Sequence, residues 1–231
     1  MLVRAIKTDI FTEGEDIIAF ITRHVPTLSE KDVLVVTSKI VALSEERTVV
    51  VRTSAEKKRL IQGESSWQSR IFSKWWLTVR DGTVVVNAGV DDSNANGKTI
   101  LLPHDSFAAA DAIRTVLKKR YRLKRLGVLI TDSRISPLRA GVTGVALGYA
   151  GFKGVRDYRG TQDLFGRTLR VTQTNVADCL ATAAVLLMGE GSERSPLSII
   201  ENAPAVFSER VSRNELHVPL KDDVFRGLFR R

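Results

Sequence analysis

Residues 127–163 read GVLITDSRISPLRAGVTGVALGYAGFKGVRDYRGTQD, and the architecture of the chain is decided in this stretch. It opens on a short apolar run, residues 127–130, which stops on Thr131, Asp132 and Ser133. An apolar run that ends on a carboxylate and hydroxyls is typical of a buried strand that carries polar side chains to one edge of a sheet. Because strand-and-helix proteins bind ligands at such an edge, the run predicts a ligand site as well as a strand.

A second apolar run has the same design. Residues 84–90 (VVVNAGV) lead into the polar residues Asp91, Asp92, Ser93 and Asn94. We expect both runs to be strands whose ends meet, so that Asp91, Asp132 and Ser133 hold one divalent cation beside a nucleotide phosphate. Carboxylate and hydroxyl oxygens are hard ligands that suit Mg²⁺ or Mn²⁺. The alternative is that both aspartates only cap turns, which is what most aspartates after strands do.

The remaining pattern predicts strands mixed with helices. Strands are expected at residues 2–6, 33–36, 48–51, 142–151 and 198–200, and helices at residues 16–23, 105–119 and 171–188. The Asp81–Gly82 turn predicts a hairpin that pairs residues 77–79 with residues 83–86. Residues 54–76, with three tryptophans, are expected to be helical. From residue 179 onward the last helix is apolar on nearly every side, so we expect that half to be buried against the sheet or a second subunit.

Two further features bear on close contacts. Residues 142–151 carry Gly144, Gly148 and Gly151, which indicates either tight packing against the metal-binding loop or a bulged strand. Residues 33–36 enter Thr37, Ser38 and Lys39 and then a helical turn, a place where backbone N–H groups can hold an anion. Taken by itself, Lys39 favours the alternative, a solvated surface lysine.

Composition narrows the class of partner. The chain has 231 residues and a formal net charge of +9, which favours an anionic partner such as a phosphorylated metabolite, an acidic substrate, nucleic acid or a membrane surface. Its single cysteine, Cys179, allows no internal disulfide. The N-terminus has no apolar signal core, and the longest apolar run is far shorter than the ~20 residues that span a bilayer. We therefore expect a cytoplasmic protein with no membrane partner.

Several motifs are shared with one known family. They are NAGVDDSN (87–94), LLPHD (101–105), ITDS (130–133), RAGVTGVALGYAG (139–151), DYRGTQDLFGRTL (157–169) and VADCLATAAVLLMGEG (176–191). Together they resemble the coenzyme F-420:L-glutamate ligase family, also called F-420-0:gamma-glutamyl ligase. VLVVTSKIVALSEER (33–47) resembles the opening of that family. The likeness is collinear and covers nearly the whole chain.

The resemblance implies an α+β fold of mixed sheets with packed helices, in which two subunits intertwine as a homodimer. It implies one ligase unit over residues 1–231, with two interlocked subdomains as the alternative. The implied activity is a GTP- or ATP-dependent amide ligase that uses Mg²⁺ or Mn²⁺. A carboxylate acceptor, F-420-0 or a related anion, is activated as an acyl phosphate and then attacked by the amine of L-glutamate.

The family's functional residues map onto this chain position by position. Its catalytic metal ligands correspond to Asp91 and Asp132, with Ser133 as a third ligand to the metal. Its nucleotide contacts correspond to Thr8, Asp9, Ile10, Phe11, Ser38, Lys39 and Asn94.

The chain also departs from the family pattern. Ile135–Ser136 replaces a Gly-Arg pair, Leu43 replaces a nucleotide-contacting lysine, and residues 198–207 (SIIENAPAVF) replace a late nucleotide-binding segment that ends in Arg-Gly. A non-catalytic or re-purposed homologue that binds a nucleotide or phosphate, with a different acceptor, is therefore the alternative function. A nucleic-acid binder is suggested only by the net charge and the basic run at residues 118–125, and we do not expect one.

Overall fold

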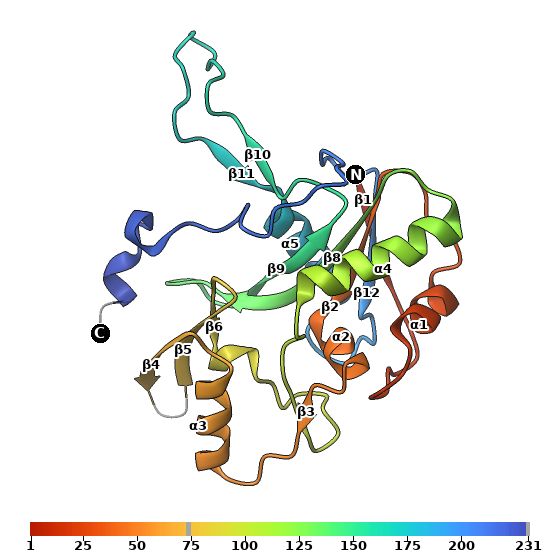
Figure 1. Cartoon of the computed structure of the whole chain (residues 1–231), viewed down its shortest axis with the longest axis vertical. Helices are drawn as coiled ribbons and strands as arrows, with labels where there is room; N and C mark the ends of the chain where they lie inside the picture. Colours follow the sequence, from red (N-terminus) through yellow and green to blue (C-terminus); the bar gives the residue numbers. More distant parts are fainter. Residues whose placement is uncertain (73–74, 230–231) are drawn as a thin grey trace.

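The computed structural model describes residues 1–72 and 75–229, and its core is a five-stranded mixed sheet (Figure 1). The strand order is β1 (Leu2–Ile6), β12 (Leu197–Glu201), β2 (Asp32–Thr37), β8 (Leu126–Ile135) and β9 (Val142–Ala150). β2 and β8 run parallel, and every other neighbouring pair is antiparallel. The α+β class is confirmed, as are the strands expected at residues 2–6, 33–36 and 198–200.

Helices cover both faces of this sheet. α1 (Ile17–His24), α2 (Ser38–Ser44) and α4 (Ser106–Tyr121) pack on the face to which β2 contributes Leu34 and Val36. α5 (Val176–Met188) packs on the opposite face, with Val33 and Val35. This explains why β2 reads as an unbroken apolar run: a strand covered on both faces has no solvent side on which to alternate.

The helix starts follow local capping signals. The Asp16 side chain accepts hydrogen bonds from the backbone N–H groups of Ile18 and Ala19, and Asp105 accepts one from Ala108. Such a cap satisfies backbone donors that the first helical turn leaves free. The helices expected at residues 16–23 and 105–119 are confirmed. None of the helices in residues 1–72 and 75–229 combines the length and the apolar character needed to span a membrane.

The glycines of β9 admit helix backbones on both faces. A Cβ on Gly144 would lie 2.3 Å from the carbonyl oxygen of Ala181 in α5, and one on Gly148 would lie 2.3 Å from the backbone of Ser106 in α4. The register shifts between these two positions, which leaves Leu147 unpaired against β8. Such a bulge turns the following residues to the opposite face. The bulged strand is therefore confirmed, whereas the expected packing of these glycines against the metal-binding loop is wrong, because the backbones that approach Gly144 and Gly148 belong to α5 and α4.

One expectation about β8 is wrong. The strand does not end at Thr131, Asp132 and Ser133 but continues to Ile135, because β9 pairs with it along this whole segment. The neighbour on the other side, β2, does end here, and its last residue, Thr37, pairs with Thr131. The polar side chains of β8 therefore lie at the edge of the sheet because β2 stops, while β8 itself runs on.

The segment between α2 and α4 forms an outer lobe, which we define as residues 48–100. It contains β3 (Thr48–Val49), α3 (Ser54–Gly63), β4 (Trp67–Phe72), β5 (Trp75–Arg80), β6 (Thr83–Val86), the 3₁₀ turn η1 (Asn87–Gly89) and β7 (Thr99–Ile100). The hairpin at Asp81–Gly82 is confirmed. The helix expected over residues 54–76 is right only for residues 54–63. The three tryptophans lie on β4 and β5, and residues 73–74 fall outside the described residues.

The strand expected over residues 84–90 is also shorter than its apolar run. β6 ends at Val86 because Asn87 (φ 52°) and Ala88 (φ 55°) take the left-handed conformation, which no strand accommodates. Thr78 holds this turn by accepting a hydrogen bond from the backbone N–H of Ala88 at 2.8 Å. The chain leaves the turn through Val90 and reaches Asp91 in a new direction.

A two-stranded ribbon projects from the sheet (Figure 1). It consists of β10 (Val155–Asp157), β11 (Gln173–Asn175) and the loop between them, which we call the arm (residues 155–175). The helix expected from residue 171 therefore begins only at Val176, where Asn175 caps it. The expected burial of its second half is also incomplete, because the side chains of Leu186 and Leu187 are exposed in the single chain.

The last segment, residues 203–229, crosses the molecule and is called the strap. Glu209 accepts two hydrogen bonds from the guanidinium of Arg114, which is buried in α4. Glu215 accepts one from the Tyr149 hydroxyl at 2.9 Å. Further along, the Phe229 ring packs on Trp67 of the outer lobe with 5.2 Å between ring centroids. The strap thus contacts both the sheet and the lobe.

Candidate functional site

A pocket of about 870 Å³ opens where β2 ends. Most of its lining comes from five places: residues 9–13, α2, the loop at residues 91–98, the middle of β8, and the loop at residues 189–196 that follows α5. Because β2 stops at Thr37 while β8 continues, Asp132 and Ser133 lie beyond the last residue of β2. The fold therefore places a recess at the carboxyl edge of its two parallel strands, where α/β sheets bind ligands.

Asp132 lies on β8, the strand of the central sheet that forms one side of this pocket. It is paired with Val145 of β9, and its carboxylate accepts a hydrogen bond from the backbone N–H of Ser133 at 2.8 Å. Burial raises the pKa of Asp132 to about 6. The positive charge of Lys39 opposes this rise in pKa and the negative charge of Asp91 adds to it, so the two carboxylates are electrostatic neighbours. The sheet thus holds a carboxylate that is poorly hydrated.

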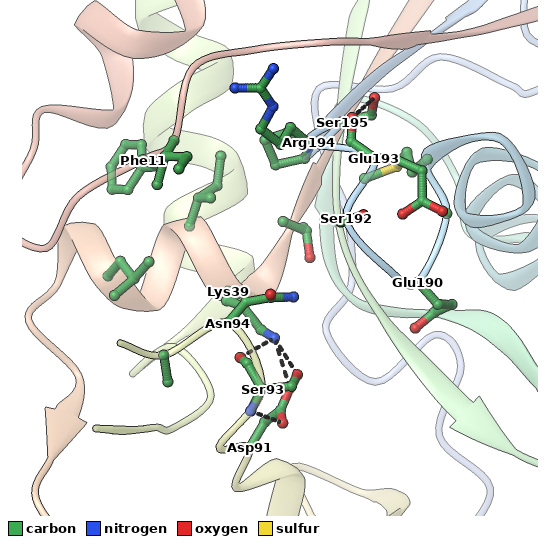
Figure 2. Close-up of a pocket in the computed structure, with 18 of the residues that line it drawn as sticks. Phe11, Lys39, Asp91, Ser93, Asn94, Glu190, Ser192, Glu193, Arg194 and Ser195 are labelled. Carbon is green, nitrogen blue, oxygen red and sulfur yellow. Dashed lines mark hydrogen bonds and ion pairs between the residues drawn. The ribbon is translucent and has the colours of Figure 1, made fainter. Parts of the chain in front are cut away.

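Asp91 is supplied by the outer lobe. Its backbone exchanges two hydrogen bonds with Ile100, which fixes the main chain at this point. Its carboxylate accepts hydrogen bonds from the amide and the hydroxyl of Ser93, each at 2.7 Å, and from the Lys39 ammonium at 2.7 Å (Figure 2). Burial acts to raise the pKa of Asp91, but the bonds from Lys39 and Ser93 together hold the pKa below its ordinary value.

Lys39 interacts with both carboxylates, with Asp91 by a hydrogen bond and with Asp132 through its charge. It is the second residue of α2, and its ammonium donates to Asp91 and also to the carbonyl (2.9 Å) and hydroxyl (3.0 Å) oxygens of Ser93. The alternative of a solvated surface lysine is therefore wrong: the side chain is 26% exposed and its ammonium lies in the pocket. The carboxylates of Asp91 and Asp132 and the ammonium of Lys39 are therefore all within reach of a ligand in the pocket.

Most of the expected nucleotide contacts lie on this pocket. The lining includes Asp9, Ile10, Phe11, Lys39 and Asn94, together with the expected metal ligands Asp91, Asp132 and Ser133. Thr8 and Ser38 are buried behind the wall and do not line it. The backbone N–H of Thr8 donates to the carbonyl of Arg194 at 2.9 Å, and the Ser38 side chain hydrogen-bonds Asp132. These two residues therefore position neighbours that line the pocket.

Sequence reasoning missed one wall. The loop at residues 189–196 contributes Glu190, Ser192, Glu193, Arg194 and Ser195 opposite Lys39 (Figure 2). The sequence predicted only a helix stop here, although a polar loop between glycines that joins a helix to a strand is a common place for binding residues. In contrast, residues 198–207, expected to contain a rewritten nucleotide-binding segment, do not line the pocket, because β12 runs away from it.

The donor set fits a hard divalent cation with an open coordination sphere. Among residues 1–72 and 75–229 there is no group of three or more histidine, cysteine, aspartate and glutamate side chains able to hold an ion. On the side of the pocket nearest Lys39, Asp91 and Asp132 offer carboxylates, and Ser93 and Ser133 offer hydroxyls. Mg²⁺ is commonly bound by one or two carboxylates, with water and substrate phosphates completing its shell. The residues present fit that ion when an oxyanion substrate shares it.

Comparison with known proteins gives the family. Residues 5–202 match the family model described as F420-0:Gamma-glutamyl ligase. The chain is 34% identical over 216 residues to the coenzyme F420:L-glutamate ligase of Methanococcus maripaludis (strain C6), covering 86% of each protein. It is 34% identical over 192 residues to that of Methanocaldococcus jannaschii (82% of this chain, 76% of that protein). It is 31% identical over 239 residues to that of Archaeoglobus fulgidus (96% and 94%). The chain therefore belongs to the F420-0:gamma-glutamyl ligase family.

Proposed function

We propose that the protein is a metal- and nucleotide-dependent amide ligase that joins L-glutamate to an anionic carboxylate acceptor of the F420-0 type. One observation carries the proposal: two carboxylates from distant parts of the chain, Asp91 and Asp132, line the same pocket, and the charge of Lys39 acts on both. The curated relatives are named coenzyme F420:L-glutamate ligase, which gives the class of acceptor and amine.

The proposed chemistry requires two steps, because forming an amide from a carboxylate in water is uphill. First, an acceptor carboxylate oxygen attacks the γ-phosphorus of GTP or ATP, the bond to the β–γ bridging oxygen breaks, and the nucleoside diphosphate leaves. The glutamate nitrogen then attacks the acyl carbon and loses a proton to solvent. The bond from that carbon to the phosphate oxygen breaks, which releases inorganic phosphate.

In this proposal the residues of the pocket position and neutralise charge. Asp91, Asp132 and the Ser133 hydroxyl would hold Mg²⁺ or Mn²⁺, which supplies a counter-charge for the phosphoryl group during its transfer. Lys39 and Arg194, on opposite walls, orient the phosphates. The wall formed by Asp9, Ile10, Phe11 and Asn94 contacts the nucleotide, and Thr8 and Ser38 support that wall from behind.

The test is a ligation assay with matched variants. Purified protein is incubated with Mn²⁺, GTP or ATP, L-glutamate and F420-0, and phosphate release and the glutamyl mass increment are followed. Asp91→Asn and Asp132→Asn are expected to lower the rate by roughly a thousandfold, the scale on which lost transition-state charge stabilisation is felt. Asp92→Asn is the control, since Asp92 is the next residue but bonds Thr99 and Lys57 outside the main pocket. Full activity in both pocket variants would overturn the proposal.

One observation favours the alternative of a binding homologue without catalysis. Leu43 lines the pocket where the family pattern has a lysine, so one phosphate contact is missing. The same assay separates the two functions. Calorimetric nucleotide binding that requires Mn²⁺, without phosphate release for any carboxylate acceptor offered, would support the binding homologue and contradict the ligase.

We also propose that the protein works as a homodimer. Leu164 and Phe165, near the tip of the arm, are 96% and 94% exposed, and a two-stranded ribbon is only marginally stable alone in water. A second copy that covers the arm and the exposed side of α5 would bury these apolar residues. Light scattering after size exclusion should give twice the chain mass for the wild type and the chain mass for Leu164→Ser/Phe165→Ser. Val224→Ser, at an exposed position on the strap, is the control that should leave the dimer intact.

A further inference from the structure

The ammonium of Lys39 occupies a place in the pocket where a cation contacts three oxygen atoms. It lies 2.7 Å from Asp91 Oδ2, 2.9 Å from the Ser93 carbonyl oxygen and 3.0 Å from Ser93 Oγ. An ammonium has three N–H donors, so each donor has its own oxygen. Its charge also acts on Asp132, whose pKa it lowers against the larger effect of burial.

This arrangement uses three of the roughly four acceptor sites of the Asp91 carboxylate, so Lys39 and Ser93 compete with any other cation for its oxygens. Oδ1 accepts the Ser93 amide, and Oδ2 accepts both the Ser93 hydroxyl and Lys39. A divalent ion bound by Asp91 and Asp132 would stand within a few ångströms of the ammonium, and two such cations repel one another strongly in a partly buried site. The ion and the ammonium therefore cannot share the site as it stands.

The Lys39 side chain is flexible enough to leave Asp91, and the pocket beside it has space for the displaced ammonium. Its four-carbon stem is flexible, it begins on the first turn of α2 at the pocket wall, and the pocket beside it is about 870 Å³. The opposite wall, at residues 189–196, is far enough away for a ligand to lie between (Figure 2). A displaced ammonium would point into that space, towards any oxyanion bound there.

We propose that Lys39 is an internal counter-ion that holds the cation position until a divalent ion displaces it, and that its released ammonium then binds the nucleotide phosphates. This inference rests on the proposed metal and nucleotide dependence and adds an order to it. Metal binding frees the lysine for the nucleotide, so each ligand should tighten the binding of the other, and by the same factor.

The test measures Mn²⁺ binding without nucleotide, by the electron paramagnetic resonance signal of free Mn²⁺. Lys39→Met keeps the length of the side chain and removes its charge, so Mn²⁺ affinity should rise by roughly tenfold or more. Lys39→Gln, a polar neutral variant, should behave in the same way. Lys39→Arg retains the charge and should show no gain. Lys57→Met removes the same charge from a lysine paired with Asp92 outside the pocket and should also show none.

A second measurement follows the coupling. In the wild type, Mn²⁺ should strengthen nucleotide binding by calorimetry, and in Lys39→Met most of that strengthening should disappear while the folded state is retained. If Mn²⁺ binds the wild type but Lys39→Met binds it equally or more weakly, the counter-ion role is wrong and the proposed function stands. If neither protein binds Mn²⁺, even with nucleotide, both the counter-ion role and the metal dependence are wrong.

Discussion

Asp132 and Asp91 face the same pocket from two different kinds of support. Asp132 belongs to a strand with neighbours on both sides, in a sheet whose two faces are packed by helices. Asp91 belongs to a loop of the outer lobe and is fixed by Ile100, Ser93 and Lys39. Burial raises the pKa of the first to about 6, whereas hydrogen bonds with Lys39 and Ser93 keep the pKa of the second low. The same residue type thus has its pKa raised by its place in the sheet and lowered by its partners in the lobe.

The contrast shows that Asp132 and Asp91 should respond differently to a bound cation. A carboxylate in a poorly hydrated strand gains most from a cation that arrives, since the cation relieves an unfavourable charge. A carboxylate already paired with lysine gains less, because a partner must first be lost. Substitutions in the sheet and in the outer lobe should therefore change the free energy of unfolding differently.

The largest effect is expected from adding a side chain to the sheet. Gly144 pairs with Ser133, and its added Cβ would meet the α5 backbone at 2.3 Å, so Gly144→Ala should cost about 3 kcal/mol of unfolding free energy. Urea titration followed by circular dichroism measures it. Gly63→Ala, at the end of α3 in the outer lobe, meets nothing within 4 Å and should be neutral or slightly stabilising. Equal losses in the two variants would contradict the rigid packing assigned to β9.

Asp132→Asn should stabilise the fold, in a pH-dependent way. Because the folded pKa of about 6 exceeds the ordinary 3.8, the folded state binds more protons in between, and wild-type stability falls as pH rises through this window. The variant lacks that fall. Its advantage should be near zero at about pH 4 and grow to roughly 2 kcal/mol above about pH 6. The free energies of unfolding of both proteins, measured by urea titration across this pH range, test the prediction. A difference between them that does not change with pH would exclude the raised pKa.

Asp91→Asn should do the opposite, and more weakly. A lowered pKa means that ionised Asp91 stabilises the fold above its ordinary value, and that this contribution is lost as pH falls through the folded pKa. The side chain is 44% exposed, so after allowance for solvent screening we expect a loss of about 0.5–1 kcal/mol at neutral pH. The loss should shrink in high salt. A double-mutant cycle with Lys39→Met measures the pair, and a coupling energy of zero would contradict the ion pair.

Local signals in the sequence were enough for much of the fold. The helices that Asp16 and Asp105 cap and the turn at Asp81–Gly82 each start from contacts among a few neighbouring atoms, and both helices and the turn are confirmed. Errors arose where distant pairing decides the outcome. β8 runs past Asp132 because β9 lies beside it, and the segment with the tryptophans becomes strands because β6 completes a sheet with it. The pairing with β9 is not visible in a local window, whereas the hairpin with β6 was predicted and only its extension to β4 was missed.

The candidate site was predicted in a similar, partial way. Polar residues after apolar runs pointed to Asp91 and Asp132, and the resemblance gave residues 9–11, Lys39 and Asn94, all of which line the pocket. The loop at residues 189–196 was missed because its pattern is only that of a helix end. The ion pair between Lys39 and Asp91 could not be predicted, because it depends on how the lobe is placed against α2.

The strap has a consequence for how the molecule assembles. It follows every strand of the five-stranded sheet in chain order. Its acidic residues bind side chains of α4 and β9, such as Arg114 and Tyr149, which are in place only when those elements are packed. Until it docks, a buried guanidinium and a buried phenol lack their acidic partners. We therefore expect the strap to dock after α4 and β9 have packed on the sheet, so that its docking distinguishes a correctly assembled sheet from a misassembled one.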